Sequence, residues 1–281
     1  MNTVNTTVAA LIQANASLNL NGADLKLVAS STVQADAKAI PADDPGTGGG
    51  FGLGISLALN IADNDTRSAI EDGALTGDVG NVALTASGDY GLDTRAEQGA
   101  SATGSGGVAL TPVFASSVAL NDTSAEIGGA LTGLTAAGDV SIEAMQISDT
   151  RTAAEGNAEA SSAAIGVALG LTVAEDNVSA QLKRDLTAGG AIMLSAQGAA
   201  ASRTSAKASA AGAEADDGME GTADDDGVNQ QTTEQRDFAD QRTADNTEST
   251  SSDASDNPDA STESGTVSVA AAISVNIEDA S

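Results

Sequence analysis

The sequence contains no cysteine, no histidine and no tryptophan, and each absence removes a class of chemistry. Without cysteine the chain can form neither a disulfide framework nor a thiol nucleophile. Without histidine it lacks the side chain that most often acts as a general acid or base near neutral pH. Without tryptophan it lacks the large ring that can stack on a sugar. We therefore expect a protein that is not an enzyme.

Large rings are scarce throughout the chain, which has three phenylalanines, one tyrosine and an aromatic content of 1%. Hydrophobic residues still make up 41% of the sequence, and most of them are alanine, valine, leucine and isoleucine. A globular core normally draws much of its buried area from aromatic side chains. Small and branched aliphatic residues instead suit thin, closely spaced layers. This composition, with 31 glycines and only 4 prolines, favours an elongated stack over a globule.

Basic residues are also few, at 11 against 40 acidic ones, so the formal net charge is −29. Such a charge disfavours binding to nucleic acid or to an anionic membrane. The sequence shows no run of the roughly 18 apolar residues that a membrane span requires. The first 20 residues have neither the basic start nor the continuous apolar stretch of a secretory signal. Because the repeat described next is cut at both ends, we expect the chain to be a fragment.

A short pattern with period two recurs four times along the chain and predicts a stacked strand. In each copy large apolar and polar residues alternate and lead to an alanine, which indicates a strand with one buried face. The aligned first positions are 57, 58 and 52 residues apart: Leu25, Val82, Val140 and Ile192. Two positions further on, one aliphatic residue per copy is expected to point inward: Leu27, Leu84, Ile142 and Leu194. The intervening residues are expected to point outward: Lys26, Ala83, Ser141 and Met193.

A second apolar element precedes each strand and runs into a cluster of Asn, Asp, Thr and Glu, which we interpret as a turn. Its copies are 57–63, 118–122, 169–173 and 273–279. A third, charged element follows the strand, with basic residues that are 57, 56 and 52 apart: Lys38, Arg95, Arg151 and Arg203. Stacking predicts a basic ladder at these positions. Asp36, Asp93 and Asp149 lie two residues away and would compensate its charge.

These elements predict an all-β protein, a right-handed parallel β-solenoid (β-helix) of about four to five imperfect repeats of about 56 residues. The absence of a shorter sub-period favours one wide coil per repeat over several narrow ones. Residues 1–211 carry the repeats. Residues 212–264 are acidic and of low complexity, which predicts a disordered insertion. Residues 265–281 begin the next repeat.

The repeat resembles the passenger regions of large bacterial surface exoproteins, namely the filamentous haemagglutinin-like, leukotoxin-like and giant adhesin repeats. The likeness is carried by Leu57–Ala86, with its (Leu/Val)-Ala-(Leu/Val)-Asn start and its Gly-(Asp/Asn)-Val-x-(Leu/Val)-x-Ala end, and by its copies. It implies export to the bacterial cell surface and a structural or adhesive role as stalk or fibre, stacked end-on with further repeats of the same chain. The alternatives that it leaves open are the passenger of a secreted toxin-like exoprotein and, less favoured, a carbohydrate-active β-helix enzyme.

The sequence indicates no catalytic and no cofactor-binding residue. If the acidic clusters were stacked turns, their oxygens could hold Ca²⁺, although the same residues are also common turn formers. The candidate calcium ligands are Asp63, Asp65, Asp122, Asp176 and Asp279. A host or neighbouring-cell receptor is the expected partner of the whole segment. The acidic insertion 212–264 could contact a basic partner or simply aid solubility.

Overall fold

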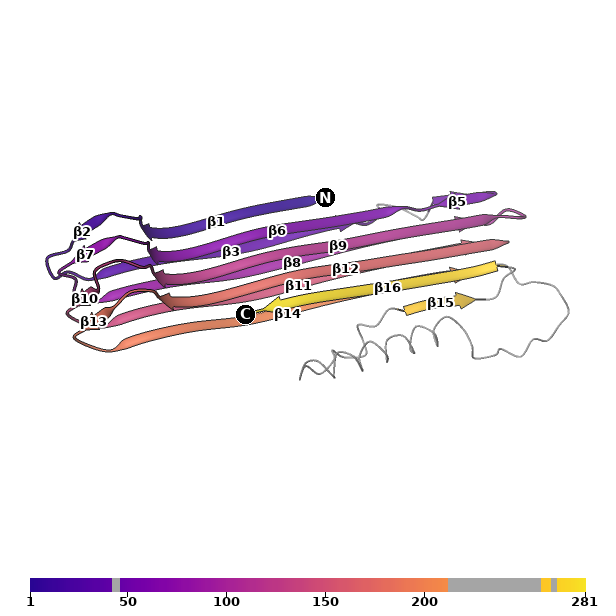
Figure 1. The fold of residues 1–281 in the computed structure, drawn as a ribbon. Helices are drawn as coiled ribbons and strands as arrows, with labels where there is room; N and C mark the ends of the chain where they lie inside the picture. The colour runs from indigo at the N-terminus through magenta and orange to yellow at the C-terminus, as the bar shows by residue number, and fades with distance from the viewer. Residues whose placement is uncertain (42–45, 212–258, 264–266) are drawn as a thin grey trace, which may run out of the picture.

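The structure, a computed structural model, describes residues 1–41, 46–211, 259–263 and 267–281, and these are almost entirely parallel β-strands (Figure 1). Two long sheets face each other. We name them the first and second sheet. The first is ordered β1-β6-β9-β12-β16, with β5 also paired to β9. Its strands are β1 (Asn2–Ile12), β5 (Phe51–Leu53), β6 (Ser56–Ile70), β9 (Val108–Ile127), β12 (Ala163–Leu182) and β16 (Val267–Ala280).

The second sheet returns the chain in the opposite direction and is ordered β15-β14-β11-β8-β3, with β4 also paired to β8. Its strands are β3 (Leu25–Ala39), β4 (Gly46–Gly48), β8 (Val82–Ala102), β11 (Val140–Ala160), β14 (Ile192–Ala211) and β15 (Asp259–Glu263). Two small parallel pairs line the bend between the long sheets. They are β2 (Ser17–Asn19) with β7 (Leu75–Gly77), and β10 (Leu134–Ala136) with β13 (Leu186–Ala188).

The strand register confirms that one sequence repeat forms one wide layer. In the second sheet Leu25 pairs with Val82, Val82 with Val140, and Val140 with Ile192. These are the positions that the periodicity aligned. The architecture is therefore all-β with parallel strands in stacked layers, compatible with a β-solenoid.

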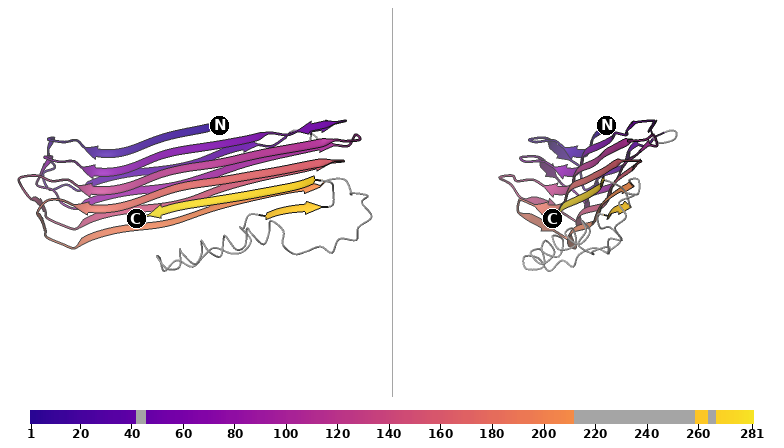
Figure 2. Two further views of the ribbon diagram at one scale, coloured as in Figure 1. Left: turned by 45° about the vertical axis from the view of Figure 1, so that its right-hand side comes forward. Right: turned by 90° about the vertical axis from the view of Figure 1, so that its right-hand side faces the viewer.

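The molecule is longest along its strands and narrow in end view (Figure 2). A strand of 21 residues such as β8 spans roughly 70 Å at about 3.3 Å per residue. Five strands side by side cover only about 24 Å at about 4.8 Å each. Each layer is thus a broad, flattened ribbon, and the stack presents wide flat faces.

The interior changes character along the strands, starting with an aliphatic core beside the small sheets. Here β-branched and leucine side chains fill the gap between the sheets, and Leu84 and Ile142 are fully buried, as the alternation predicts. Leu27 is half-buried in the outer layer. Leu194, at 44% exposed, is not inside as expected, because it lies on β14 beyond the reach of β16, which pairs with β12 only up to Asp176. The loop at this end turns at Gly73, which has φ +71°.

The opposite half of the interior is built almost only from alanine and glycine. Its core consists of seventeen buried residues, of which Val113 is the only one larger than alanine in this part of the described chain. A Cβ on Gly166 of β12 would lie 2.2 Å from the carbonyl oxygen of Ser209 on β14. The two sheets are therefore in contact through their backbones here, and larger inward side chains cannot be accommodated.

Between these two cores lies a buried polar layer. Thr66 contacts the hydroxyl of Tyr90 at 2.7 Å, and Thr152 contacts Thr172 at 2.6 Å across the two sheets. Pairing these buried hydroxyl groups with one another avoids the cost of desolvating each of them alone. The recurring threonines and asparagines of the repeat thus have an internal role.

Two sequence interpretations are corrected by the strand lengths. The elements expected as separate short strands merge into strands of 15 to 21 residues. The clusters at Asp63–Asp65, Asn121–Asp122 and Glu175–Asn177, interpreted as turns, lie inside β6, β9 and β12. Strands continue through them because alternate residues are satisfied on the inner face by neighbouring layers. The copy at 118–122 was also aligned wrongly. The alignment with 57–63 matches Asn121 to Asn60, but in the structure Asn121 pairs with Asn64.

The predicted basic ladder is broken in the middle. Lys38 lies opposite Arg95 and Arg151 opposite Arg203, but Arg151 lies opposite Asp93. Arg95 and Arg151 are 56 residues apart, whereas β8 and β11 pair residues that are 58 apart. Arg151 therefore lies opposite Asp93 and not opposite Arg95. Charge compensation is nevertheless present, since Lys38 Nζ is 3.5 Å from both Asp36 and Asp93.

The predicted acidic insertion, 212–264, lies mostly outside the described residues. Its residues 259–263 form β15 and pair with Lys207–Ala211 of β14. The second sheet therefore resumes before residue 265, where the next repeat was expected to begin, and β16 follows from Val267 as predicted.

Candidate functional site

The five candidate calcium ligands do not converge. Asp63, Asp65, Asp122 and Asp279 belong to the register positions that face outward from the first sheet, whereas Asp176 is buried and faces inward. Asp65 lies opposite Asp122, but Asp63 lies opposite Leu120. Within the described ranges no group of three or more acidic, histidine or cysteine side chains is placed to hold a metal ion.

The inward-facing members of the same clusters form a hydrogen-bonded ladder across three layers. Asn64 donates to Asn121 Oδ1 at 2.8 Å, and Asn121 donates to Asp176 Oδ1 at 2.8 Å. Gln146 of the second sheet also donates to Asp176 Oδ1 at 2.8 Å. Amide ladders of this kind hold successive layers in register, so these residues stabilise the stack.

The outward-facing acids repel one another. The pKa of Asp122 is raised, first by burial and then by the carboxylate of Asp65 in the adjacent strand. A hydrogen bond from Ser124 and the charge of Arg67 oppose this effect. This pair forms part of an acidic band across the first sheet, which we define by Asp63, Asp65, Asp122, Glu175 and Asp279.

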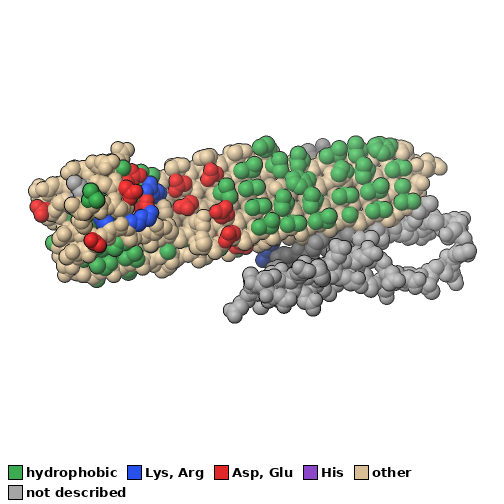
Figure 3. All heavy atoms as spheres, in the orientation of Figure 1, with side chains coloured by type: hydrophobic (Ala, Val, Ile, Leu, Met, Phe, Trp, Pro, Cys, Tyr) green, Lys and Arg blue, Asp and Glu red, His purple; other side chains and the backbone are tan. Residues whose placement is uncertain are grey.

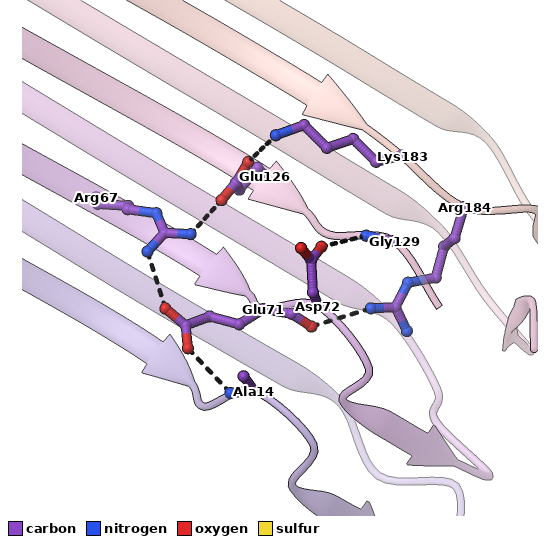
Figure 4. A network of polar contacts seen from close by, with 8 residues as sticks. All are labelled: Ala14, Arg67, Glu71, Asp72, Glu126, Gly129, Lys183 and Arg184. Carbon is purple, nitrogen blue, oxygen red and sulfur yellow. Dashed lines mark hydrogen bonds and ion pairs between the residues drawn. The ribbon is translucent and has the colours of Figure 1, made fainter. Parts of the chain in front are cut away.

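Next to the acidic band, a network of ion pairs and hydrogen bonds links the ends of four strands (Figure 4). Arg67 donates to Glu71 Oε1 at 2.9 Å and also to Glu126. Lys183 donates to Glu126 Oε2 at 2.7 Å, and Glu71 Oε2 accepts from the backbone amide of Ala14 at 2.9 Å. The network thus connects all layers from β1 to β12.

Glu126 is the centre of this network, with a side chain that is 15% exposed. Burial opposes its ionisation, but the hydrogen bonds from Lys183 and Arg67 outweigh burial and lower its pKa below the ordinary value. For Arg67, burial likewise favours the neutral form, and its contacts with Glu126 and Glu71 prevail and raise the pKa. Both groups are therefore held in their charged forms.

Glu126→Gln removes an acid-sensitive part of the stability. Because the folded-state pKa of Glu126 is depressed below 4.5, its contribution is complete above that value and is lost as the pH falls through the folded-state pKa. We expect the difference in free energy of unfolding between wild type and variant to be largest near about pH 7 and to shrink below about pH 4.5. Urea unfolding at a series of pH values measures it.

The control for this prediction is Glu175→Gln, which removes one carboxylate from the same sheet outside the network. A Glu126→Gln difference that stays constant across the whole pH series would contradict the assignment.

Arg184 is the second charged feature at the end of the strands beside the small sheets. Its buried side chain links three layers by hydrogen bonds. Its guanidinium donates to the carbonyl oxygens of Gly128, Ala74 and Glu71, with the Ala74 bond at 2.7 Å. Burial lowers its pKa, partly offset by the charge of Asp72. Sequence reasoning missed this residue. The available signal was that Lys183 and Arg184 are the only adjacent basic residues in the chain.

A groove of about 630 Å³ lies on the second sheet. It is lined by Pro41 and by three carboxylates, Glu97, Glu155 and Glu159. Glu97 and Glu155 are register neighbours, and Lys207 lies opposite Glu155 on the other side. The acids therefore continue the charged ladders of this face.

One face of the molecule carries an extensive group of hydrophobic side chains. Figure 3 shows hydrophobic side chains that cover about half the length of one face, bounded by acidic and then basic side chains. Ile55 is 65% exposed and Leu57 is 56% exposed. Sequence alternation revealed the period of these residues, but their direction, away from the interior, was not predicted.

The fold and these surfaces define a class, an all-β protein of stacked parallel layers, in whose described residues no group of acidic, histidine or cysteine side chains is placed to hold a metal ion. Comparison with protein-family models, with curated proteins and with solved structures found no match. In the part of the chain that the structure describes, no helix has the length and apolar character to cross a membrane.

Proposed function

We propose that the chain is a structural and adhesive β-solenoid segment of an exported bacterial surface protein. The observation that carries the proposal is the continuous register of long strands from layer to layer. In β11 alone, 21 residues pair with β8 and 20 pair with β14. Such pairing suits a load-bearing stalk, because separating two layers requires breaking a whole ladder of backbone hydrogen bonds.

In this proposal the coils are right-handed, as parallel crossovers nearly always are, and further repeats of the same kind lengthen the stack. The resemblance to surface exoprotein repeats supports export, and the positions that carry it support the fold. Val82 and Leu84 fill the aliphatic core, while Ala86 packs beside them. Antibody labelling of intact, unpermeabilised cells tests the surface location, and labelling only after permeabilisation argues against it.

Mechanical unfolding tests the structural role directly. Ser30, Ser87, Met145 and Gln197 form one column through four layers. Because the chain has no cysteine, Ser30→Cys with Gln197→Cys provides unique handles at the two ends of this column. We expect force spectroscopy to release the chain layer by layer, in contour steps of roughly 200 Å, since a repeat of about 57 residues extends by about 3.6 Å per residue.

The matched control is Ser30→Cys with Ser87→Cys, which spans adjacent layers and is expected to yield one step of the same size. Release of the entire Ser30–Gln197 length in a single event at low force would contradict a modular stalk.

A further inference from the structure

The outer side of the first sheet carries a continuous apolar face, which we define by the outward aliphatic and aromatic residues of β5, β6, β9, β12 and β16 and of the short link before β6. In register, its rows run Phe51-Val108-Ala163-Val267, Leu53-Leu110-Ile165-Val269, Pro112-Val167-Ala271, Leu57-Phe114-Leu169-Ile273, Leu59-Ser116-Leu171-Val275 and Ile61-Val118-Val173-Ile277. Ile55 lies in the link between Leu53 and Leu57 and is 65% exposed. Only Ser116 interrupts the face. Side chains this large normally lie inside a protein.

These residues face outward because the inner side has no room for them. Their inward neighbours are small, such as Ala58, Ala115 and Ala168, and all three are buried in the alanine core. A four-strand width of about 19 Å and a length of about 36 Å give a flat area of roughly 700 Å². A soluble monomer rarely exposes a contiguous apolar patch of this size.

The outer side of the second sheet is not continuously apolar. Its outer side carries charged positions such as Asp93, Arg95 and Glu97 along β8, and Arg151 on β11. Apolar residues such as Ile147 occur there among charges. The apolar face is therefore a property of one side of the molecule and not of the composition.

We propose that the apolar face is the interface with a second copy of this chain. Two such faces brought together bury roughly 1,400 Å² in total, which lies within the range of specific, stable protein interfaces. Two flat sheets of aliphatic side chains pack face to face in the way that the sheets of a β-sandwich do. The face is self-complementary in chemistry, and a two-fold axis needs no other partner.

Other occupants match the face less well. Residues 212–258 of the same chain contain few large apolar side chains and many acids, so they offer little to bury against it. A membrane surface is disfavoured by the adjacent acidic band and by the net charge of −29. A copy of the chain supplies both a flat shape and an equal aliphatic area.

The acidic band also determines how the two copies are oriented. It borders only one end of the apolar face, beside the row that starts at Ile61. A two-fold axis parallel to the strands would place the two acidic bands against each other. An axis perpendicular to the strands places them at opposite ends of the interface, which avoids the repulsion. The copies are therefore arranged with their strands antiparallel.

The test compares substitutions in the apolar face with one at a similarly exposed position on the opposite side of the molecule. Leu57 of the apolar face is 56% exposed, and Ile147 of the second sheet is 59% exposed. Sedimentation velocity over a concentration series is expected to show a dimer for wild type and for Ile147→Glu. Leu57→Glu combined with Leu169→Glu is expected to raise the dissociation constant at least about 100-fold. Added salt is expected to tighten the wild-type dimer by screening the net charge.

Circular dichroism checks that each variant is folded, and Leu57→Thr with Leu169→Thr replaces the glutamates if it is not, since threonine suits a strand. A wild-type monomer at about 100 μM would overturn the proposal, because an interface of this size forms well below that concentration. If Ile147→Glu weakened the dimer as much as the substitutions at Leu57 and Leu169, the proposal would also be overturned. A monomer that binds zwitterionic vesicles through Leu57 would assign the face to lipid instead. None of these outcomes depends on the layer-by-layer unfolding that tests the structural role.

Single cysteines test the orientation, using the two ends of the same strand. Val108 and Val118 lie in the first and last rows of the apolar face on β9. In the antiparallel dimer, Val108→Cys cross-links to Val118→Cys in a mixture, and neither cross-links to itself. Efficient self-cross-linking of Val108→Cys would show the parallel arrangement and overturn the orientation.

Discussion

Gly166→Val is expected to lower the free energy of unfolding by about 3 kcal/mol or more. Gly166 faces inward on β12, and a Cβ there would lie 2.2 Å from the carbonyl oxygen of Ser209 on the opposite sheet and 3.2 Å from that of Gly156. Both contacts are backbone atoms in paired strands, so neither can move away without breaking the ladder. Urea unfolding followed by circular dichroism measures the loss.

The control is Gly50→Val, because a Cβ on Gly50 meets nothing within 4 Å. Valine has a higher strand propensity than glycine, so propensity alone would stabilise the Gly166 variant. A stability equal to that of wild type would therefore show that the two sheets can separate at this point, and would refute the backbone contact between them.

Arg184→Met is expected to lower the free energy of unfolding by about 3 kcal/mol. Methionine retains much of the apolar length of the side chain but leaves the carbonyl groups of Ala74, Gly128 and Glu71 without the guanidinium donor. These carbonyls belong to two earlier layers, so the loss should appear as cooperative destabilisation of the whole bend. Thermal and urea unfolding both report it.

Lys183→Met is the matched control at the adjacent position. Lys183 is 51% exposed and pairs with Glu126 at the surface, so its loss is expected to cost less than about 1 kcal/mol. Arg184→Lys keeps the positive charge but cannot reproduce three donors in one plane, and it should restore only part of the stability. Equal effects of the Arg184 and Lys183 substitutions would contradict the stabilising role of the three hydrogen bonds from Arg184.

The sequence was most informative about the second sheet. The alternation around Val82 and Leu84 predicted both the strand and its buried side, and the spacing of Leu25, Val82, Val140 and Ile192 predicted the register. Apolar spacing works here because β3, β8 and β11 place their large residues in the same aliphatic core. The charged positions were less reliable, since a slip of two residues keeps the same face and therefore costs little at the surface, as at Arg151.

The candidate site was predicted less well, because polar residues were interpreted by their local propensity. Asn64 and Asn121 are good turn formers, yet they are buried in strands that hydrogen-bond to each other. An inward side chain can be satisfied by its copy in the next layer, and no local rule contains that partner. For the same reason Arg184, whose acceptors lie in two other layers, left no pattern in the sequence beyond its basic neighbour.

The sequence by itself determined the period, the all-β class and the parallel stacking of repeats, because each depends on spacing that recurs along one chain. It could not decide which side of the strands in the first sheet lies inside. In the run from Leu53 to Ile61, large residues alternate with small ones, and alternation is unchanged when the strand is turned over. The gap between the two sheets decides the question. Where their backbones touch at Gly166, only glycine and alanine fit inside, and Leu57 and its copies are left on the surface.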